Sequence, residues 1–404
     1  MTDLRIGVVT PSYPPLGGGI ATAHYQMARA LSAQYDVRVF AYDDGRAQNE
    51  PGIIRRQTPS RLKALLVWAM KQYVRRKVPT GQLRLCPSIA SISVGAWRLR
   101  SPIVQFEPDV IISPDAYLPL YWLRIPPSTK TVWVSHNNYL RFRNNPLIDS
   151  GAVLDNDIAR SMERKALHKA DAVVCPSQYM VGEYHRAYDH ALPLFMIHYF
   201  MDFELLDSIE AYPLRGELDV SANVPLVYIP SAGSVQKGKR HSFEIVRRLH
   251  AMRKGDVAFY LSGSIPGDLQ YELDSIGGLK LHAPGHVEWS SNVSRAKACD
   301  LAVSPTLVEN FSLAIIEGLA AGLPYVTFDT GGNAEMVIDG VSGAVVPYLD
   351  IEAMIRRAAD LLDAPERLRA MGVTASERIR KQLDTNRLIQ QYTELFEELF
   401  RAAG

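Results

Sequence analysis

The chain has 404 residues, of which 47% are hydrophobic and 22% charged, with a formal net charge of +1 and three cysteines. This length favours two hydrophobic cores over one, and the ordinary composition argues against a disordered chain. Three widely spaced cysteines predict neither a disulfide framework nor a zinc site, and they fit a reducing compartment. Because we find no leader-like N-terminus and no run of about 18 apolar residues, we expect a cytoplasmic chain that does not span a bilayer.

The first half alternates short apolar runs with segments of helical period, the pattern of βαβ units on a parallel sheet. Strands are expected over residues 5–10, 35–42, 109–115, 130–136 and 171–177. Amphipathic helices are expected between some of them, over 20–34 and 154–170.

The second half repeats this pattern after a proline-bearing stretch at 207–225. Strands are expected over residues 225–231, 256–263, 280–287, 300–305 and 323–329. Two Rossmann-like α/β domains facing each other across an interdomain cleft fit these elements better than one large sheet. We expect an N-terminal domain over 1–205 and a C-terminal domain over 206–385, with the helix 386–404 packing back on the first.

A basic insert occupies residues 51–106, which contain eleven lysines and arginines and no acid. Within it, residues 60–78 place apolar side chains at helical spacing and basic ones elsewhere. Such a helix favours an anionic membrane surface as partner, and a core helix with a solvated basic face is the alternative. Nucleic acid is not expected as a partner, because no binding module accompanies the charge.

The glycine triplet at 17–19 follows the first expected strand and opens the first helix. Gly18 and Gly19 would let the backbone approach a ligand, and the free amides of a helix start attract phosphate. The motif is not GxGxxG, so an ordinary flexible turn remains the alternative.

Two further candidates follow strands, at the end of a parallel sheet where ligands bind. His136 ends the strand at 130–136, where an imidazole could hydrogen-bond a ligand. Lys237 follows the strand at 225–231 and precedes a helix, where an ammonium group could neutralise phosphate. The alternatives are a plain loop histidine and a solvated basic turn.

Glu309 and Glu317 lie eight positions apart around the start of an apolar helix, in VENFSLAIIEG. If the helix begins near Ser312, its first amides form a site for an anionic oxygen. Glu317 then lies roughly 7 Å further along the axis, about the separation of a diphosphate from its ribose. The alternative is one acid that complements the helix dipole and one solvated acid.

Taken in order, these motifs resemble the retaining glycosyltransferases of glycosyltransferase family 4, which have the GT-B fold. The resemblance is strongest over residues 300–347, DLAVSPTLVENFSLAIIEGLAAGLPYVTFDTGGNAEMVIDGVSGAVVP. It includes the glycine loop, FEPDVIISPD, the strand ending at His136, ADAVVCPSQYM and the Lys237-Gly238 turn. The matches cover most of the chain in the order of the family.

The resemblance implies a reaction centre with Glu309 and His136 near the transferred sugar and Lys237 on the diphosphate. The donor-binding residues that it implies are Gly18, Gly19, Val287, Phe311, Ser312, Leu313 and Glu317. Glu317 would bind the ribose, Val287 would face the nucleobase, and the others would hold the diphosphate. The N-terminal domain would then be the acceptor side and the C-terminal domain the nucleotide-sugar side.

The implied reaction moves a hexose from a UDP- or GDP-sugar to an acceptor hydroxyl with retention, without metal or cofactor. The acceptor would be a carbohydrate or a lipid-linked glycan of cell-surface polysaccharide, lipopolysaccharide or glycolipid assembly, and the enzyme would lie on the inner face of the membrane. The alternatives are a sugar-nucleotide epimerase of the same fold and a non-catalytic sugar-nucleotide-binding protein. The sequence departs from the family at Ser231 and Ala232, where an arginine is frequent, and at Tyr199-Phe200, where Asn-Gly is usual.

Overall fold

The computed structural model describes residues 4–14, 18–43, 50–57, 59–75, 85–140, 153–189 and 192–401. The contacts divide the chain into two compact units. Unit 1 is Met1–Phe200 with Thr385–Gly404, and unit 2 is Met201–Asp384. The boundaries expected from sequence, after residues 205 and 385, lie five residues and one residue further along the chain than those at Phe200 and Asp384.

Unit 1 contains a seven-stranded sheet in the order β3-β2-β1-β4-β5-β6-β7, and every pairing in it is parallel. Its strands are β1 (Arg5–Thr10), β2 (Asp36–Ala41), β3 (Ile53–Arg55), β4 (Val110–Pro114), β5 (Lys130–Val134), β6 (Ala172–Cys175) and β7 (Leu194–Met196). Because β2 and β3 extend the sheet to one side of β1 and the later strands to the other, the chain order reverses between β1 and β4. The three-residue strands β3 and β7 were not expected.

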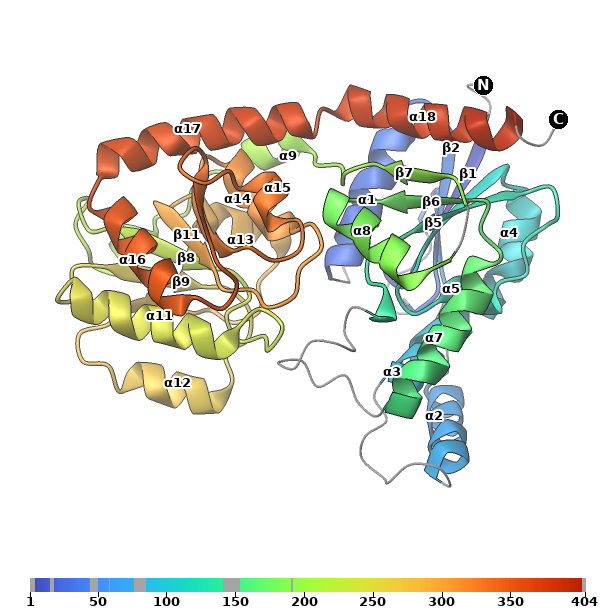
Figure 1. Cartoon of the computed structure of the whole chain (residues 1–404), viewed down its shortest axis with the longest axis horizontal. Helices are drawn as coiled ribbons and strands as arrows, with labels where there is room; N and C mark the ends of the chain where they lie inside the picture. The colour runs from blue at the N-terminus through green and yellow to red at the C-terminus, as the bar shows by residue number, and fades with distance from the viewer. Residues whose placement is uncertain are drawn as a thin grey trace. The chain divides into compact units, whose positions relative to one another are not determined.

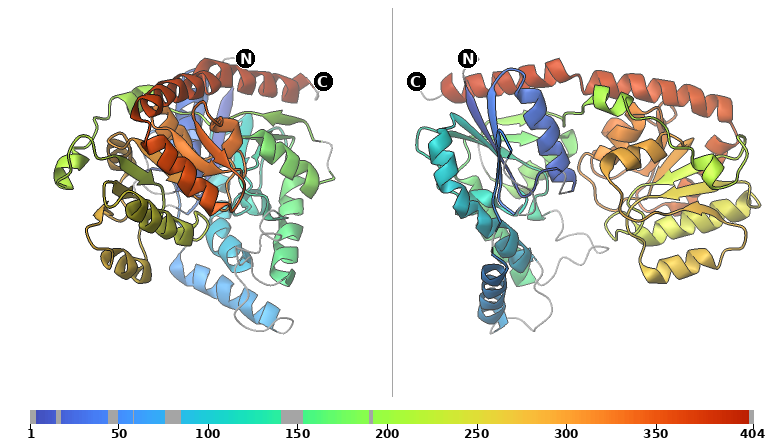
Figure 2. Two further views of the ribbon diagram at one scale, coloured as in Figure 1. Left: turned by 60° about the vertical axis from the view of Figure 1, so that its left-hand side comes forward. Right: turned by 180° about the vertical axis from the view of Figure 1, so that it is seen from behind.

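Helices cover both faces of this sheet (Figures 1 and 2). The helices of unit 1 are α1 (Gly19–Leu31), α2 (Ser60–Arg75), α3 (Leu85–Ser93), the 3₁₀ helix η1 (Val94–Leu99), α4 (Arg100–Phe106), α5 (Pro119–Trp122), α7 (Val153–Leu167), α8 (Gln178–Ala187) and α18 (Thr385–Arg401). Helix α2 projects away from the sheet and contacts α3 (Figure 1). The C-terminal helix α18 contacts α1, where Tyr392 donates a hydrogen bond to the Met27 sulfur at 3.3 Å. The apolar face of α18, including Leu388 and Phe396, is buried.

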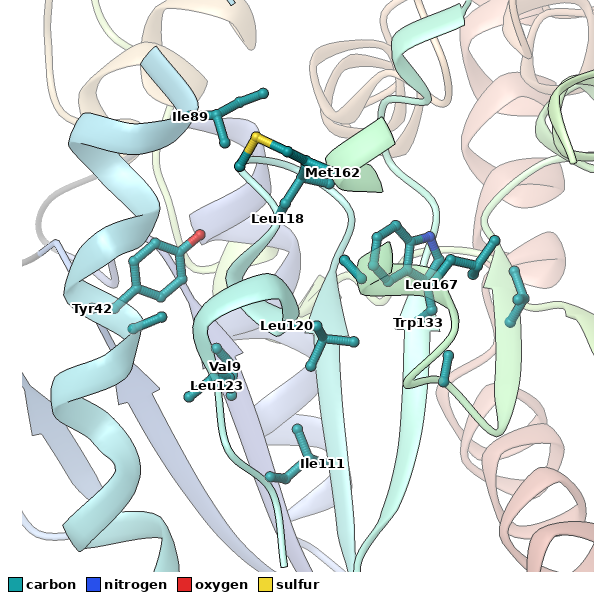
Figure 3. Packing of buried hydrophobic residues seen from close by; sticks show 14 of the residues in the cluster. Val9, Tyr42, Ile89, Ile111, Leu118, Leu120, Leu123, Trp133, Met162 and Leu167 are labelled. Carbon is teal, nitrogen blue, oxygen red and sulfur yellow. The ribbon is translucent and has the colours of Figure 1, made fainter. Parts of the chain in front are cut away.

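The core of unit 1 forms between its central strands and the helices on one face (Figure 3). Strands β4 and β6 are buried at every position, as expected for apolar strands covered on both faces. Ile111 and Trp133 come from strands β4 and β5, while Ile89 and Leu167 come from helices α3 and α7.

Unit 2 contains a six-stranded sheet in the order β10-β9-β8-β11-β12-β13, again parallel throughout. Its strands are β8 (Leu226–Ile229), β9 (Ala258–Leu261), β10 (Lys280–His282), β11 (Leu301–Ser304), β12 (Tyr325–Phe328) and β13 (Gly343–Val346). The α/β class and the two parallel sheets predicted from sequence are confirmed. The observed strands are mostly shorter than the predicted ones, and the difference is largest for β10. This strand ends at His282 rather than at Val287, because Pro284 and Gly285, the latter at φ 84°, turn the chain.

The helices of unit 2 also lie on both faces of its sheet (Figure 2). They are α9 (Phe203–Asp207), α10 (Leu214–Glu217), α11 (Lys239–Met252), α12 (Gly267–Asp274), α13 (Trp289–Ala296), α14 (Leu313–Ala320), α15 (Asn333–Met336), α16 (Ile351–Leu362) and α17 (Pro365–Gln382). Pro365 at the first position of α17 and the Asp350 cap of α16 explain where these helices begin. Among the described residues, no helix combines the length and apolar character needed to cross a membrane.

Candidate active site

The chain order of the unit 2 sheet reverses between β8 and β11, and ligands of such sheets bind beside the strand ends at this switch point. The two loops that leave these strands pack backbone to backbone. Leu307 donates a hydrogen bond from its amide to the Gln236 carbonyl at 2.9 Å. At Gly238, with φ 78°, a Cβ atom would lie 2.1 Å from the Pro305 carbonyl oxygen. A glycine is therefore required where the two loops meet.

Lys237 and Glu309 face each other across these two loops. The Lys237 ammonium lies 2.5 Å from Oε2 of Glu309, and the two side chains are 33% and 12% exposed. The other carboxylate oxygen of Glu309 accepts the Asn310 amide at 3.0 Å. The structure thus brings together two residues predicted for the reaction centre, but it pairs them with each other. A phosphate that binds Lys237 must compete with Glu309 for the ammonium group.

The glycine pair at 331–332 supports the main chain of Glu309. Gly331 has φ 59°, and a Cβ atom there would lie 2.2 Å from the Glu309 carbonyl oxygen. Gly332 donates its amide to the Asn310 carbonyl at 2.7 Å. The loop that follows β12 and contains Gly331 and Gly332 therefore fixes the main chain that carries Glu309, because the close backbone contact leaves this main chain little room to shift.

Helix α14 follows the Glu309 loop. Ser312 is its N-cap, and its hydroxyl accepts the Ile315 amide at 3.4 Å. Phe311 and Ser312 are buried, whereas Leu313 at the first helical position is half-buried. The first amides of a helix have no partner within the helix, so this end of α14 is suited to an anionic oxygen.

Glu317 lies in the second turn of α14, which packs tightly on β12. A Cβ atom at Gly318 would lie 2.4 Å from the Tyr325 ring, and Tyr325 donates to the Ala314 carbonyl at 2.6 Å. The carboxylate of Glu317, which is half-buried, accepts a hydrogen bond from Nε1 of Trp289 at 2.8 Å. Burial raises the pKa of Glu317 to about 7, although the Trp289 hydrogen bond opposes the shift.

Trp289 was not among the residues predicted from sequence. An indole nitrogen can only donate, so a half-buried tryptophan needs an acceptor, but no sequence pattern shows that this acceptor is Glu317. Trp289 begins α13, two residues after Val287. Val287, expected at a strand end, is half-buried in the turn between β10 and α13.

A buried arginine binds the main chain that precedes the glycine loop of unit 1. Gly18 is the N-cap of α1, which begins at Gly19, and Gly17 lies outside the described residues. Arg55, at the end of β3, donates to the carbonyls of Tyr13 at 3.0 Å and Pro14 at 2.8 Å. This arginine therefore fixes the main chain just before the glycine loop, and no sequence pattern indicates that contact.

His136 follows β5 in a loop held by one buried carboxylate. Asp115, directly after β4, accepts the amides of His136 at 2.9 Å, Asn137 at 2.7 Å and Asn138 at 2.9 Å. A carboxylate that accepts three amides is well satisfied even when buried. Asp115 therefore sets the main chain that presents the His136 ring.

The His136 ring is hydrogen-bonded at both nitrogens. Its Nε2 lies 3.1 Å from Nε2 of His24, and its Nδ1 lies 2.8 Å from the Tyr199 hydroxyl. Burial and the neighbouring His24 hold the pKa of His136 well below its usual value, so the imidazole is neutral. A ligand can hydrogen-bond this ring only after one of the two contacts opens.

Each unit therefore gathers part of the predicted set. Unit 1 contains Gly18, Gly19 and His136, and unit 2 contains Val287, Lys237, Glu309, the start of α14 and Glu317. Within the described ranges, no three histidine, cysteine, aspartate or glutamate side chains form a group that could hold a metal ion.

Two family profiles match the chain. Residues 17–205 match the profile described as Glycosyltransferase Family 4, and residues 226–364 match that described as Glycosyl transferases group 1. Together with the two parallel-sheet units, these matches define a glycosyltransferase of the GT-B fold. The chain belongs to glycosyltransferase family 4.

The chain is also similar in sequence to a curated protein and in fold to solved structures. Alpha-maltose-1-phosphate synthase of Mycolicibacterium smegmatis is 27% identical over 261 residues, 59% of this chain and 66% of that protein. The chain spans between 17% and 66% of the length of the curated relatives it matches. Sucrose-phosphate synthase from Thermosynechococcus elongatus superposes with a TM-score of 0.72 at 18% identity, covering 99% of this chain and 100% of that one. HepE of Anabaena in complex with UDP-glucose superposes with a TM-score of 0.66 at 18% identity, covering 98% of this chain and 100% of that one.

Proposed function

We propose that this protein is a retaining glycosyltransferase that moves a hexose from a UDP- or GDP-sugar to an acceptor hydroxyl. The observation that carries the proposal is the arrangement at the switch point of unit 2. There Lys237, Glu309 and the start of α14 surround one pair of strand ends, and Glu317 follows in the next turn of α14. A positive charge, free amides and a carboxylate acceptor suit a diphosphate that is joined to a ribose.

In this proposal the diphosphate of the donor binds at the start of α14 and displaces Glu309 from Lys237. Glu317 accepts the ribose hydroxyls while Trp289 holds its carboxylate in place. Val287, on the turn before Trp289, faces the nucleobase, and Gly18 and Gly19 approach the donor from the glycine loop. The solved complex of HepE with UDP-glucose, a protein of the same fold, supports a nucleotide-sugar donor.

Catalysis would come from stabilising the leaving diphosphate. Negative charge grows on this group as the bond to the sugar breaks, and Lys237 with the α14 amides is placed to meet it. Glu309, once released from Lys237, and His136 would contact the transferred sugar. No metal ion or cofactor is part of the proposal, so transfer should continue in the presence of a chelator.

The proposed acceptor is a carbohydrate or a lipid-linked glycan at the inner face of the cell membrane. Helix α2 exposes Leu65 and Trp68, at 57% and 58%, in a segment whose charges are all basic. Such a surface suits the boundary of an anionic bilayer. Co-sedimentation with vesicles of phosphatidylglycerol, but not of phosphatidylcholine alone, should detect this contact, and equal binding to both would contradict it.

A thermal-shift screen of UDP- and GDP-sugars tests the main proposal, because a ligand that binds the native state raises its melting temperature. At least one donor should stabilise the wild-type protein, and Glu317→Gln should weaken that effect. NMR of the product should then show retained configuration at the transferred carbon. An inverted product, or release of an epimerised sugar without any acceptor, would contradict the proposed reaction.

A further inference from the structure

Unit 1 carries an open groove of about 310 Å³ that lies apart from the residues discussed so far. It is lined by Arg56, Trp97, Arg98, Ser101, Pro102 and Gln105. The lining supplies two guanidinium groups, an indole that is 52% exposed, a hydroxyl and an amide, and it contains no carboxylate. This combination suits an anionic ligand with a ring attached.

Local contacts hold both guanidinium groups in place. Arg98 donates from Nη1 to the Gln57 carbonyl at 2.6 Å, and Arg56 donates from Nη1 to the Arg55 carbonyl at 3.0 Å. Each guanidinium has five N–H donors, so these contacts leave others for a ligand. Neither arginine forms an ion pair within the described ranges. The surrounding segment, residues 51–106, contains no acid that could neutralise them.

The chemistry of the groove favours phosphate. The planar fork of an arginine binds phosphate through two parallel hydrogen bonds, and two such groups in one groove provide a full countercharge. Trp97 offers an apolar face on which the ring of a sugar can pack. A neutral sugar would use only part of this lining.

The position of the groove relates it to the candidate site. Arg56 follows directly after β3, so this side of the groove lies at the carboxyl edge of the sheet, the edge that also carries the glycine loop and His136. Strand β3 is two positions from β1, or about 10 Å at about 4.8 Å per strand. Arg55 directly joins the end of β3 to the main chain before the glycine loop. A sugar phosphate held in the groove can thus extend along one edge toward the glycine loop.

We propose that this groove binds the phosphate of a phosphate-bearing acceptor, with Arg56 and Arg98 on the phosphate and Trp97 against the adjoining ring. The acceptor hydroxyl then extends along the sheet edge of unit 1 toward the glycine loop. The assignment of this ligand as an acceptor rests on the proposed glycosyl transfer.

Binding without donor tests the groove directly. Titration calorimetry with glucose 1-phosphate, with glucose, and with vesicles of phosphatidylinositol or phosphatidylcholine separates a soluble sugar phosphate from a lipid headgroup. Either glucose 1-phosphate or phosphatidylinositol should bind. Its counterpart without net negative charge, glucose for the sugar phosphate and zwitterionic phosphatidylcholine for the lipid, should bind at least about tenfold more weakly. If neither probe binds, or glucose binds as well as glucose 1-phosphate, the proposal is wrong.

Variants assign the site. Arg56→Gln and Arg98→Gln should each lower the affinity for the bound probe by about tenfold or more. Arg100→Gln removes a nearby exposed charge of α4 that does not line the groove, and it should leave the affinity unchanged. Equal losses in all three variants would show a diffuse charge effect and overturn the site. Melting temperatures close to that of the wild type exclude unfolding as the cause.

Donor assays keep this proposal separate from the proposed function. Binding and slow hydrolysis of the nucleotide sugar should be unchanged in Arg56→Gln and Arg98→Gln, while transfer to the phosphate-bearing acceptor falls. If these variants transfer at the wild-type rate, the groove assignment is wrong and the glycosyltransferase proposal stands. If the wild-type protein binds no nucleotide sugar, the proposed function is wrong whether or not the groove binds phosphate.

Discussion

The ammonium group of Lys237 lies 2.5 Å from the carboxylate of Glu309, although 72 residues separate them in the chain. This ion pair joins the two loops at the switch point of unit 2. It holds the Lys237 ammonium group in the site, and it gives the Glu309 carboxylate an oppositely charged partner there. A donor diphosphate would exchange one anionic partner of Lys237 for another, which releases the Glu309 side chain only when the donor is bound.

We expect Lys237→Met to lower the affinity for the donor by about tenfold or more, because a charged hydrogen bond to the diphosphate is lost. Stability should fall by only about 1–2 kcal/mol, because Glu309 retains some access to water and the Asn310 amide as a partner. Calorimetric titration with UDP and denaturant unfolding measure the two effects. The control is Lys239→Met, which removes a neighbouring charge; an equal loss of affinity in it would contradict a specific role for Lys237.

Glu317 gives unit 2 a pH dependence of stability with a defined sign. Burial raises its pKa from 4.5 to about 7, so between these values the folded chain keeps a proton that the unfolded chain has released. The stabilisation is full below about pH 4.5 and is lost as the pH rises through 7, in total about 3 kcal/mol. Glu317→Gln still offers an oxygen to Trp289 but cannot titrate. The free energy of unfolding of Glu317→Gln minus that of the wild type should therefore be larger at pH 8 than at pH 5, as measured by urea unfolding at both pH values.

The same ionisation should control donor binding. If the ribose hydroxyls donate to the ionised carboxylate, the affinity for UDP-glucose, which has no terminal phosphate that titrates in this range, should increase by about tenfold between pH 6 and pH 8. In Glu317→Gln the affinity should be weaker and flat over this range. A wild-type affinity that does not change with pH, measured by calorimetry, would contradict the assignment of Glu317 to the ribose.

Some of this architecture could be predicted from sequence because it depends on local patterns. The strand β4 begins with three apolar, β-branched residues, Val110 to Ile112, and this pattern predicts a buried parallel strand without knowledge of its neighbours. The start of α14 was predicted from Ser312, because a capping hydroxyl before an apolar helix is a local signal. The strand β3 has only three residues, which is too short for any period to appear.

Side-chain partners could not be predicted in the same way, because they come from distant parts of the chain. Trp289 and Glu317 meet only because α13 and α14 pack together, and no spacing within the sequence records that contact. Lys237 and Glu309 were each predicted to bind a ligand, whereas the fold pairs them with each other. Sequence therefore identified where polar groups gather, and the fold decided which groups are already satisfied.

The His24–His136 contact predicts a second pH dependence, in unit 1. Burial lowers the pKa of His24 from 6.5 to about 3 and holds that of His136 well below its usual value, so both stay neutral in the folded chain. The unfolded chain binds protons below pH 6.5. Stability is therefore full above that value and falls as the pH drops toward 3, by about 1.4 kcal/mol per pH unit for each histidine.

We expect His24→Gln to reduce this acid sensitivity. Glutamine can hydrogen-bond His136 but cannot titrate. Between pH 6 and pH 4, unfolding of the variant should therefore bind about one proton fewer than unfolding of the wild type. Guanidinium unfolding across this range, followed by tryptophan fluorescence, measures the slope. A slope identical to that of the wild type would mean that His24 is already protonated in the folded chain.

Gly331 tests whether the glycine pair positions Glu309. Gly331→Ala places a Cβ atom against the Glu309 carbonyl at φ 59°, whereas Gly340→Ala, at φ 74°, meets no atom within 4 Å. Both variants carry the cost of a positive φ, about 1 kcal/mol. Only Gly331→Ala must also displace the main chain of Glu309, so it alone should lower donor affinity and the rate of transfer. The comparison separates displacement of the loop from backbone strain, because equal activity in the two variants would show that this loop does not position the reaction centre.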